Sequence, residues 1–247
     1  RQRLGEAGYS MTWRTYDGQI ENQTGAIEEA GLVRARAIIC DSLGGDATTA
    51  AVKASNNNHV PVFLMNKSID QMGVAGCQIV TNEIGALKEL AAHFAENVSE
   101  GAYISISEEN ADQRTQELSN KTQVALERIQ GSGNFGEIDL EQIGSFIDEH
   151  PELRAIVCIT PEKTRSVAET LVASGRRDQI KLYCVHGDNM VCGLVDQGIV
   201  EACLVKPGEE LASQTADKMI RYFRQGRADW VERQYVTALL YTGSDES

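Results

Sequence analysis

The sequence is short of positive charge and of long apolar runs. Lys and Arg number 23 against 36 Asp and Glu, which gives a formal net charge of −13. A nucleic-acid-binding surface needs basic side chains against phosphates, so this balance argues against nucleic acid as a partner of this segment, and equally against anionic lipid. No apolar run approaches the roughly 18 residues of a membrane span. Solubility alone is the favoured explanation of the acidity, ahead of any specific acidic partner.

Sequence motifs of enzymes are missing as well. No G-x-G-x-x-G follows a strand-like run, and there is no P-loop, no G-x-S-x-G and no H-E-x-x-H. The histidines are scattered along the chain: His59, His93, His150 and His186. A thiol nucleophile at Cys158 or Cys184 would need a neighbouring base that the sequence does not place. We therefore expect no enzymatic activity, no catalytic residue, no cofactor and no metal site.

The cysteines form no C-x-x-C pair, and no paired histidines accompany them at zinc spacing. They are Cys40, Cys77, Cys158, Cys184, Cys192 and Cys203. Because four of them lie in or beside apolar strand-like runs, buried free thiols that pack as small hydrophobic side chains are the favoured interpretation. A disulfide is the alternative. Free thiols would suit the cytosol, or the outside of an anaerobe's cell.

What the sequence does contain is an alternation of short apolar runs with amphipathic stretches. With 42% hydrophobic and 24% charged residues over 247 positions, it has the composition of a globular protein with room for one large or two medium α/β domains. Strands are expected at 9–16, 35–40, 60–65, 78–80, 102–107, 154–159, 181–185, 201–205 and 235–241. Helices are expected at 19–32, 46–57 and 82–97, and from Asp112, Glu137, Pro161, Asn189 and Glu209.

Such alternation is typical of βαβ units, whose parallel strands are apolar throughout because helices cover both faces of the sheet. Roughly ten strands are more than one doubly wound sheet of this length usually holds, so two Rossmann-like lobes fit better. The one candidate for a flexible stretch is 131–136, a Gly- and Ser-rich segment.

The order of these segments resembles the type I periplasmic binding proteins, the ribose-binding-like superfamily. The stretch from Gly31 to Lys67, GLVRARAIICDSLGGDATTAAVKASNNNHVPVFLMNK, is similar to the sugar-binding pattern of two buried strands around a helix. Four later segments follow in the family's order and spacing: HPELRAIVCIT, IKLYCVHGDN, DQGIVEACLVKPGEELASQTADKMI and RYFRQGRADWVERQYVTALLYT. No single motif is specific, but the ordered set covers nearly the whole chain.

The resemblance implies two three-layer α/β lobes joined by three crossovers. Carried over, the N-terminal lobe comprises residues 1–98 plus 208–234, and the C-terminal lobe comprises residues 99–207 plus 235–247. The crossovers are then expected near Val98, Pro207 and Gln234. In that family the ligand lies between the lobes, at the carboxyl ends of the parallel strands, where open α/β sheets habitually bind.

Two departures from the family pattern concern missing strands. The family opens with a strand that this sequence does not contain, and it has another strand where only the Gly- and Ser-rich stretch 131–136 stands here. Either these strands are lost or their residues are absent from the sequence. The second interpretation is favoured, because a parallel sheet without them would leave unpaired backbone groups and an open edge.

The family's ligand contacts follow its strand ends. The matching positions are Asp41, Asn66, Lys67, Thr160, His186 and Lys206. The family's helix-start arginine has no aligned counterpart, since Gln116 or Leu118 stands there, and Arg114 is a shifted substitute up to one turn earlier. Carboxylate, amide and ammonium groups in a dry site would satisfy sugar hydroxyls, and each missing partner would cost about 1–3 kcal/mol.

Structural roles are the alternatives for several of these residues. Capping of the following helix is the alternative for Asp41 and for Asp46. Thr160, which precedes a proline, has the pattern of a helix N-cap. At His186 and Lys206 the alternatives are a plain loop histidine and a solvated lysine.

Compared with sugar-binding members of the family, the site has lost carboxylates and kept cations. His186 and Lys206 stand where the family has acidic or amide side chains, and Asn66-Lys67 replaces Asp-Arg. Because carboxylates are the usual bidentate acceptors for sugar hydroxyls, these residues are less typical of a site for an ordinary pentose or hexose. A ligand that carries a carboxylate or phosphate becomes more plausible.

The resemblance implies a monomeric, extracytoplasmic solute-binding protein that captures a sugar, polyol or sugar acid for an ABC permease. The alternatives are the ligand-sensing domain of a membrane sensor or of a lactose-repressor-type regulator, and a scaffold whose site binds nothing. No signal peptide is visible before Arg1-Gln2-Arg3, and a mature chain would look the same, so the choice between periplasm and cell-surface lipoprotein stays open.

Overall fold

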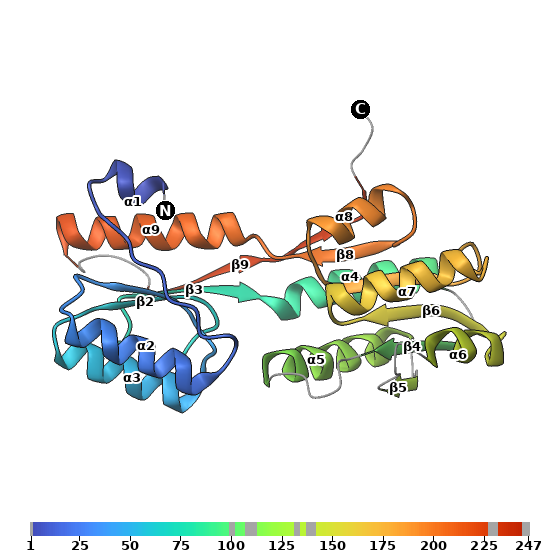
Figure 1. Ribbon diagram of the computed structural model, residues 1–247, viewed down its shortest axis with the longest axis horizontal. Coiled ribbons are helices and arrows are strands. Elements are labelled where there is room, and N and C mark those ends of the chain that lie inside the picture. Colours follow the sequence, from blue (N-terminus) through green and yellow to red (C-terminus); the bar gives the residue numbers. More distant parts are fainter. Residues whose placement is uncertain are drawn as a thin grey trace. The chain divides into compact units, whose positions relative to one another are not determined.

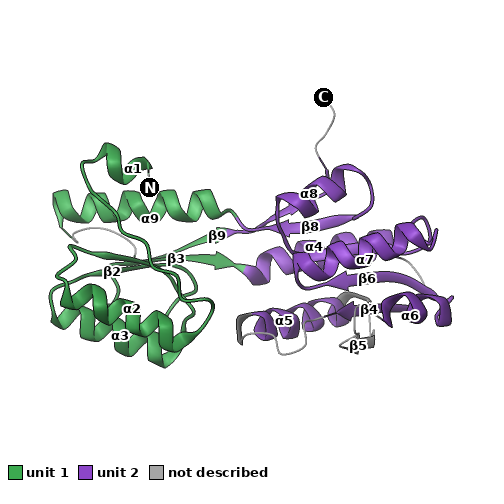
Figure 2. Ribbon diagram, in the orientation of Figure 1, with its two compact units in different colours: residues 1–82, 207–236 green, residues 83–206, 237–247 purple. Residues whose placement is uncertain are grey.

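The computed structural model describes residues 2–98, 102–106, 113–130, 134–136, 142–226 and 232–243. The chain divides into two compact units (Figure 2): Arg1–Asn82 with Pro207–Val236, and Glu83–Lys206 with Thr237–Ser247. Each unit has its own sheet, so the predicted two-lobe α/β class is confirmed. Among the described residues, no helix combines the length and the apolar character that a membrane crossing requires.

Unit 1 is built on a four-stranded sheet in the order β1-β2-β3-β9. Its strands are β1 (Ile38–Asp41), β2 (Val62–Asn66), β3 (Cys77–Asn82) and β9 (Arg233–Thr237). β2 is parallel to both β1 and β3, with Ile38 opposite Val62 and Phe63 opposite Cys77. The carboxyl ends of β1, β2 and β3 therefore meet at one edge of the sheet.

Helices cover both faces of this sheet (Figure 1). α2 (Ile20–Leu32) and α3 (Gly45–Asn57) lie on one side, and α1 (Gln2–Glu6) and α9 (Gly208–Gln225) on the other. The side chains of β2 alternate accordingly: Val62 and Leu64 join the α2/α3 core, whereas Phe63 packs with α9.

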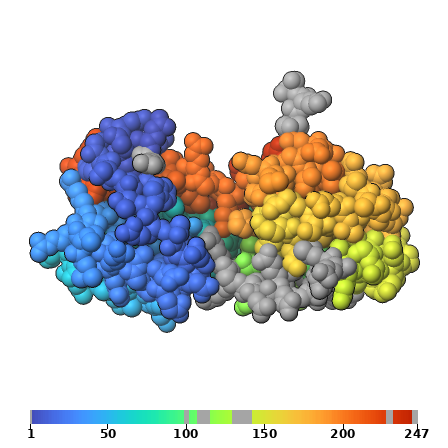
Figure 3. All heavy atoms as spheres, in the orientation of Figure 1, coloured from blue at the N-terminus to red at the C-terminus, as the bar shows by residue number. Residues whose placement is uncertain are grey.

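Segments far apart in sequence pack together within unit 1. The blue N-terminal segment lies against the orange-red α9 in the space-filling view (Figure 3), and Arg3 pairs there with Asp217 at 2.7 Å. The prediction of a strand at residues 9–16 is wrong, because no strand forms there. Tyr9 instead packs against Phe223 with the two rings tilted and their centroids 5.2 Å apart. Apolar alternation produced the prediction, but a strand also needs a neighbour's backbone groups.

Unit 2 is built on a six-stranded sheet in the order β10-β8-β7-β6-β4-β5. Its strands are β4 (Ala102–Ile106), β5 (Asn134–Gly136), β6 (Leu153–Cys158), β7 (Lys181–Gly187), β8 (Ala202–Val205) and β10 (Leu239–Tyr241). All pairings are parallel except that of β10 with β8. The expectation of a missing strand at 131–136 is wrong, because β5 pairs with β4 at the edge of the sheet.

Two core layers enclose this sheet. One holds α4 (Glu83–Asn97) and α5 (Gln113–Gln130), and the other holds α6 (Ile143–Glu149), α7 (Pro161–Ala173) and α8 (Asn189–Asp196). The helix expected from Glu137 begins at Ile143, and residues 137–141 lie outside the described part of the chain.

The described units differ from the predicted lobes in the place of α4. The family resemblance implies that residues 83–98 belong to the first lobe, whereas α4 packs in unit 2, with Leu90 and Phe94 in the same core cluster as Tyr183. Helical periodicity shows that one face is buried, but not which sheet covers it. The closing strand expected at 235–241 is likewise divided at Ala238, into β9 and β10.

Candidate ligand-binding site

Polar side chains end the parallel strands of unit 1 and contact one another. Asn66, at the end of β2, donates its side-chain amide to Asp41 Oδ1 at 2.9 Å, across the end of β1. Thr81, near the end of β3, donates its hydroxyl to Asn66 Oδ1 at 3.0 Å. Because the Thr81 hydroxyl takes the amide oxygen, the amide nitrogen is turned toward Asp41. We call Asp41, Asn66, Lys67 and Thr81 the unit 1 rim.

Asn66 also has an unusual backbone. Its φ is 77°, in the left-handed region that non-glycine residues seldom adopt and that asparagine tolerates best. The side chain is 5% exposed, and the next amide, that of Lys67, turns back to the Met65 carbonyl at 3.1 Å. Strained residues held by surrounding contacts are found preferentially at functional sites.

The turn after β1 is held by Tyr16 and by Gln23 of α2. The Asp41 carbonyl accepts hydrogen bonds from the Tyr16 hydroxyl and, at 3.5 Å, from the Gln23 amide. The Gln23 side-chain oxygen accepts in turn from the Leu43 amide at 3.4 Å and from the Thr48 hydroxyl at 2.9 Å. The sequence did not mark Tyr16 or Gln23 as site residues. Gln23 gave one signal, since it lies on the otherwise apolar face of its helix.

The capping alternatives for Asp41 and Asp46 are wrong. α3 begins at Gly45 after an N-cap at Gly44, and Asp46 is exposed in the first helical turn, where a carboxylate favours the helix dipole. The surroundings of Gly44 favour glycine at this position. A Cβ there would lie 3.2 Å from the Ser68 carbonyl and 3.7 Å from the Lys67 side chain, so its absence lets Lys67 lie against the turn after β1.

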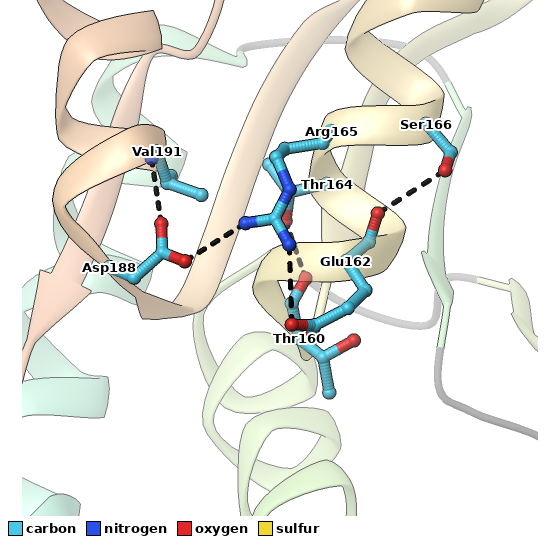
Figure 4. Close-up of polar contacts among 7 residues, drawn as sticks. All are labelled: Thr160, Glu162, Thr164, Arg165, Ser166, Asp188 and Val191. Carbon is cyan, nitrogen blue, oxygen red and sulfur yellow. Dashed lines mark hydrogen bonds and ion pairs between the residues drawn. The ribbon is translucent and has the colours of Figure 1, made fainter.

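In unit 2 the predicted residues follow neighbouring parallel strands. Thr160 follows β6, His186 lies near the end of β7, and Lys206 follows β8. Thr160 occupies the N-cap position of α7, as the capping alternative predicts. Its side chain, however, makes no capping hydrogen bond. Its carbonyl accepts from the Thr164 hydroxyl at 2.8 Å (Figure 4).

An ion-pair network that the sequence analysis missed joins the starts of α7 and α8. Arg165 donates to Asp188 at 2.9 Å and to Glu162 at 3.2 Å (Figure 4). Asp188 also caps α8 by accepting from the Val191 amide at 2.9 Å. Burial acts to raise the pKa of Asp188, but the hydrogen bonds from Val191 and Arg165 outweigh it and lower the pKa. An Asp between a strand and a helix was the available signal for this cap.

We call Thr160, His186, Asp188 and Lys206 the unit 2 rim. The parallel register of β6, β7 and β8 brings their carboxyl ends to one edge of the sheet. The structure thus brings Asp41, Asn66 and Lys67 together in unit 1 and places Thr160, His186 and Lys206 along one edge in unit 2. Arg114 belongs to α5, but its side chain lies outside the described residues. In the part of the chain that the structure describes, no three His, Cys, Asp or Glu side chains gather as metal ligands.

Comparison with known proteins gives relatives over nearly the whole chain, although no family model matches it. The chain is 25% identical over 254 residues to a D-apiose import binding protein of Actinobacillus succinogenes. The alignment covers 99% of this chain and 82% of that protein. A solute-binding protein of Burkholderia graminis in complex with D-arabinose superposes with a TM-score of 0.81 at 15% identity, covering 98% of this chain and 87% of that one.

A second solved structure with a similar fold is the periplasmic binding protein component of the arabinose ABC transporter of Shewanella sp. ANA-3, bound to α- and β-L-arabinofuranose. It has a TM-score of 0.80 at 14% identity and covers 98% of this chain and 84% of that one. Two α/β units, strand-end polar rims and these relatives agree with one another. The chain has the two-lobe α/β fold of the sugar-binding periplasmic proteins with which it superposes.

Proposed function

We propose that this chain is an extracytoplasmic solute-binding protein that takes up a sugar with strand-end side chains and presents it to an ABC transporter. The observation that carries the proposal is the ordered Thr81–Asn66–Asp41 hydrogen-bond chain at the carboxyl ends of β3, β2 and β1. The relatives are named for binding and import, which supports a binding protein rather than an enzyme and transport rather than sensing.

The unit 1 rim supplies the groups that sugar hydroxyls need. The Asp41 carboxylate is a strong acceptor, and Asn66 holds one of its oxygens in place at 2.9 Å. A preorganised acceptor loses little freedom when a hydroxyl binds, and this favours affinity for a small rigid ligand. Lys67 adds a donor, held beside the turn at Gly44.

The unit 2 rim offers a second set of groups on one sheet edge. His186 is partly exposed at the end of β7, and Lys206 is partly exposed after β8. Since D-apiose, D-arabinose and L-arabinofuranose are the sugars named for the three proteins compared above, we propose a five-carbon sugar as the ligand.

The test is a thermal-shift screen, followed by titration calorimetry, with D-apiose, D-arabinose, L-arabinose, D-ribose, their sugar acids and matched polyols. At a hundred times its Kd, a ligand stabilises the folded state by about 2.7 kcal/mol. For a chain of this size that corresponds to a rise in Tm of roughly 5 to 11 °C.

Two variants separate rim binding from unspecific stabilisation. Asp41→Asn keeps the size of the side chain and removes its charge, so we expect it to weaken binding of the sugar found in the screen. Asn57→Ala changes an exposed residue at the end of α3 and serves as the control. A screen in which no sugar, sugar acid or polyol raises the Tm at millimolar concentration would contradict the proposal.

A further inference from the structure

Four of the cysteines gather in unit 2. Cys158 on β6 lies opposite Cys184 on β7, and Cys184 lies opposite Cys203 on β8. The fourth, Cys192, lies on α8, and its sulfur is 3.9 Å from the sulfur of Cys203. All four belong to the core layer of α6, α7 and α8 or pack against it.

The sulfurs of the pair on α8 and β8 are in van der Waals contact. A disulfide has a sulfur–sulfur distance of about 2.05 Å, so the two sulfurs would have to approach by roughly 2 Å. Rotation of the Cys192 and Cys203 side chains would have to supply this approach. Gly187 on β7 leaves the space that Cys203 needs, since a Cβ at Gly187 would lie 2.7 Å from the Cys203 sulfur.

The two thiols differ in access to solvent. Cys203 is buried, whereas Cys192 is partly exposed. Burial raises the pKa of Cys203, and the neighbouring thiols Cys192 and Cys184 add to the effect, so its thiolate is disfavoured. A dissolved reagent therefore meets Cys192 first. Cys158 and Cys184 are both fully buried within the core layer and are not reached by this route.

We propose that Cys192 and Cys203 are a modification site that forms a reversible disulfide by exchange with a small-molecule disulfide. The Cys192 thiolate attacks one sulfur of the reagent and expels one reagent thiolate, which leaves a mixed disulfide on Cys192. Cys203 then gives up its proton and attacks the Cys192 sulfur, and the second reagent thiol leaves. Two protein thiols are oxidised, and one reagent disulfide is reduced to two thiols.

The bond would tie α8 to β8 directly beneath the unit 2 rim. Gly187, which lies against Cys203, stands between His186 and Asp188, and Asp188 caps α8. Oxidation of the Cys192–Cys203 pair would therefore change the packing beneath His186 and Asp188 of the unit 2 rim. The proposal rests on the geometry of unit 2 alone and not on the proposed function.

The experiment incubates the folded full chain with 2-hydroxyethyl disulfide, then denatures it in acid, alkylates the remaining thiols and analyses the product by mass spectrometry. The wild type is expected to lose the mass of two hydrogens and to retain four of its six alkylatable thiols. Peptide mapping should link Cys192 to Cys203, and dithiothreitol should restore all thiols.

Three variants sharpen the result. Cys203→Ala is expected to hold one half of the reagent on Cys192, because the second thiol is missing. Cys192→Ala should take up no reagent at this site. Because residue 192 is partly exposed and residue 203 is buried, we expect Cys192→Ala to fold even if Cys203→Ala does not. Cys77→Ala, at a buried thiol of unit 1, serves as the control and should form the Cys192–Cys203 bond as the wild type does.

Three results would overturn the proposal. One is a wild type that retains every alkylatable thiol after incubation. The second is a persistent mixed disulfide on Cys192 in the presence of Cys203. The third is a disulfide that joins Cys203 to Cys184 instead.

Discussion

The side-chain amide of Asn66 donates a 2.9 Å hydrogen bond to the carboxylate of Asp41, so that the ends of β2 and β1 are joined by their side chains. The same amide accepts from Thr81 on β3. One side chain therefore links three strand ends while its own backbone stays in the left-handed region. This contact, more than any single motif, organises the unit 1 rim.

Replacing Asn66 tests that contact. Asn66→Ala removes the Asn66–Asp41 and Thr81–Asn66 hydrogen bonds and puts alanine at a positive φ, so we expect a loss of about 2 to 4 kcal/mol in the free energy of unfolding. Urea unfolding measures it. Asn66→Gly should recover roughly 1 kcal/mol, since glycine accepts the backbone conformation. Asn57→Ala, at an exposed site, should stay within about 0.5 kcal/mol of the wild type. Equal losses for Asn66→Ala and Asn57→Ala would refute the linking role.

Gly187 tests the packing beneath the unit 2 rim. A Cβ at this position would meet the Cys203 sulfur at 2.7 Å and the Cys203 Cβ at 3.0 Å, so Gly187→Ala should cost about 1–3 kcal/mol of stability. Removing the sulfur in the double variant Gly187→Ala, Cys203→Ala should recover part of the loss, which appears as non-additivity. Gly193→Ala is the matched control, because nothing lies within 4 Å of its added Cβ. Strict additivity of Gly187→Ala and Cys203→Ala would show that this contact is not the cause.

Asp188 should contribute stability that depends on pH. Its pKa is lowered from the ordinary value of 3.8, so its contribution is present above that pH and is lost as the pH falls through the lower, folded value. Because its side chain is 41% exposed, water screens the pair with Arg165, and we expect about 0.2–1 kcal/mol at pH 7. Asp188→Asn keeps an N-cap residue and removes the charge. Its stability should fall below that of the wild type at pH 7 and converge with it in acid.

Arg165→Met supplies the second arm of that experiment. With the guanidinium gone, the loss of stability that Asp188→Asn causes at pH 7 should shrink, because Arg165 donates to the carboxylate at 2.9 Å. Chemical unfolding at several pH values compares the wild type, the two single variants and the double variant. A loss that is unchanged by Arg165→Met would assign the effect to the helix cap alone.

The two lysines of the rims test the charge of the ligand. Lys67→Met and Lys206→Met keep the aliphatic bulk and remove the charge, so an anionic ligand should bind each variant more than about tenfold more weakly. Added salt should weaken the wild type more than the variants if the site is wet. Lys53→Met, at an exposed position of α3, is the control. Unchanged affinity in both rim variants would eliminate a cationic site and favour a neutral sugar or polyol held by Asp41 and Asn66.

Much of the fold could be predicted because hydrophobic periodicity is local. The alternation of apolar runs with amphipathic stretches marked the strands around Ile39, Leu64 and Val157 and the helices between them, and strand ends marked Asp41 and Asn66 as candidates. A run that is apolar on both faces must be buried on both faces, so a parallel sheet under two helical layers follows from the sequence.

The remaining features depend on contacts between segments distant in sequence. Alternation at 9–16 could not show that no strand would pair there, and helical periodicity could not show that α4 belongs to the second sheet. A strand of three residues such as β5 is too short to show a periodic signal, and its register comes from β4.

The sequence by itself determined the fold class and the strand ends where polar side chains stand, since both follow from local patterns of burial. Only the tertiary structure decided the contacts that make those positions a site: the left-handed Asn66 held between Asp41 and Thr81, and the Arg165–Asp188 pair across two helix starts. Hydrogen bonds require particular distances and directions. Residues that are 15 and 25 positions apart along the chain meet them only after the sheet has assembled.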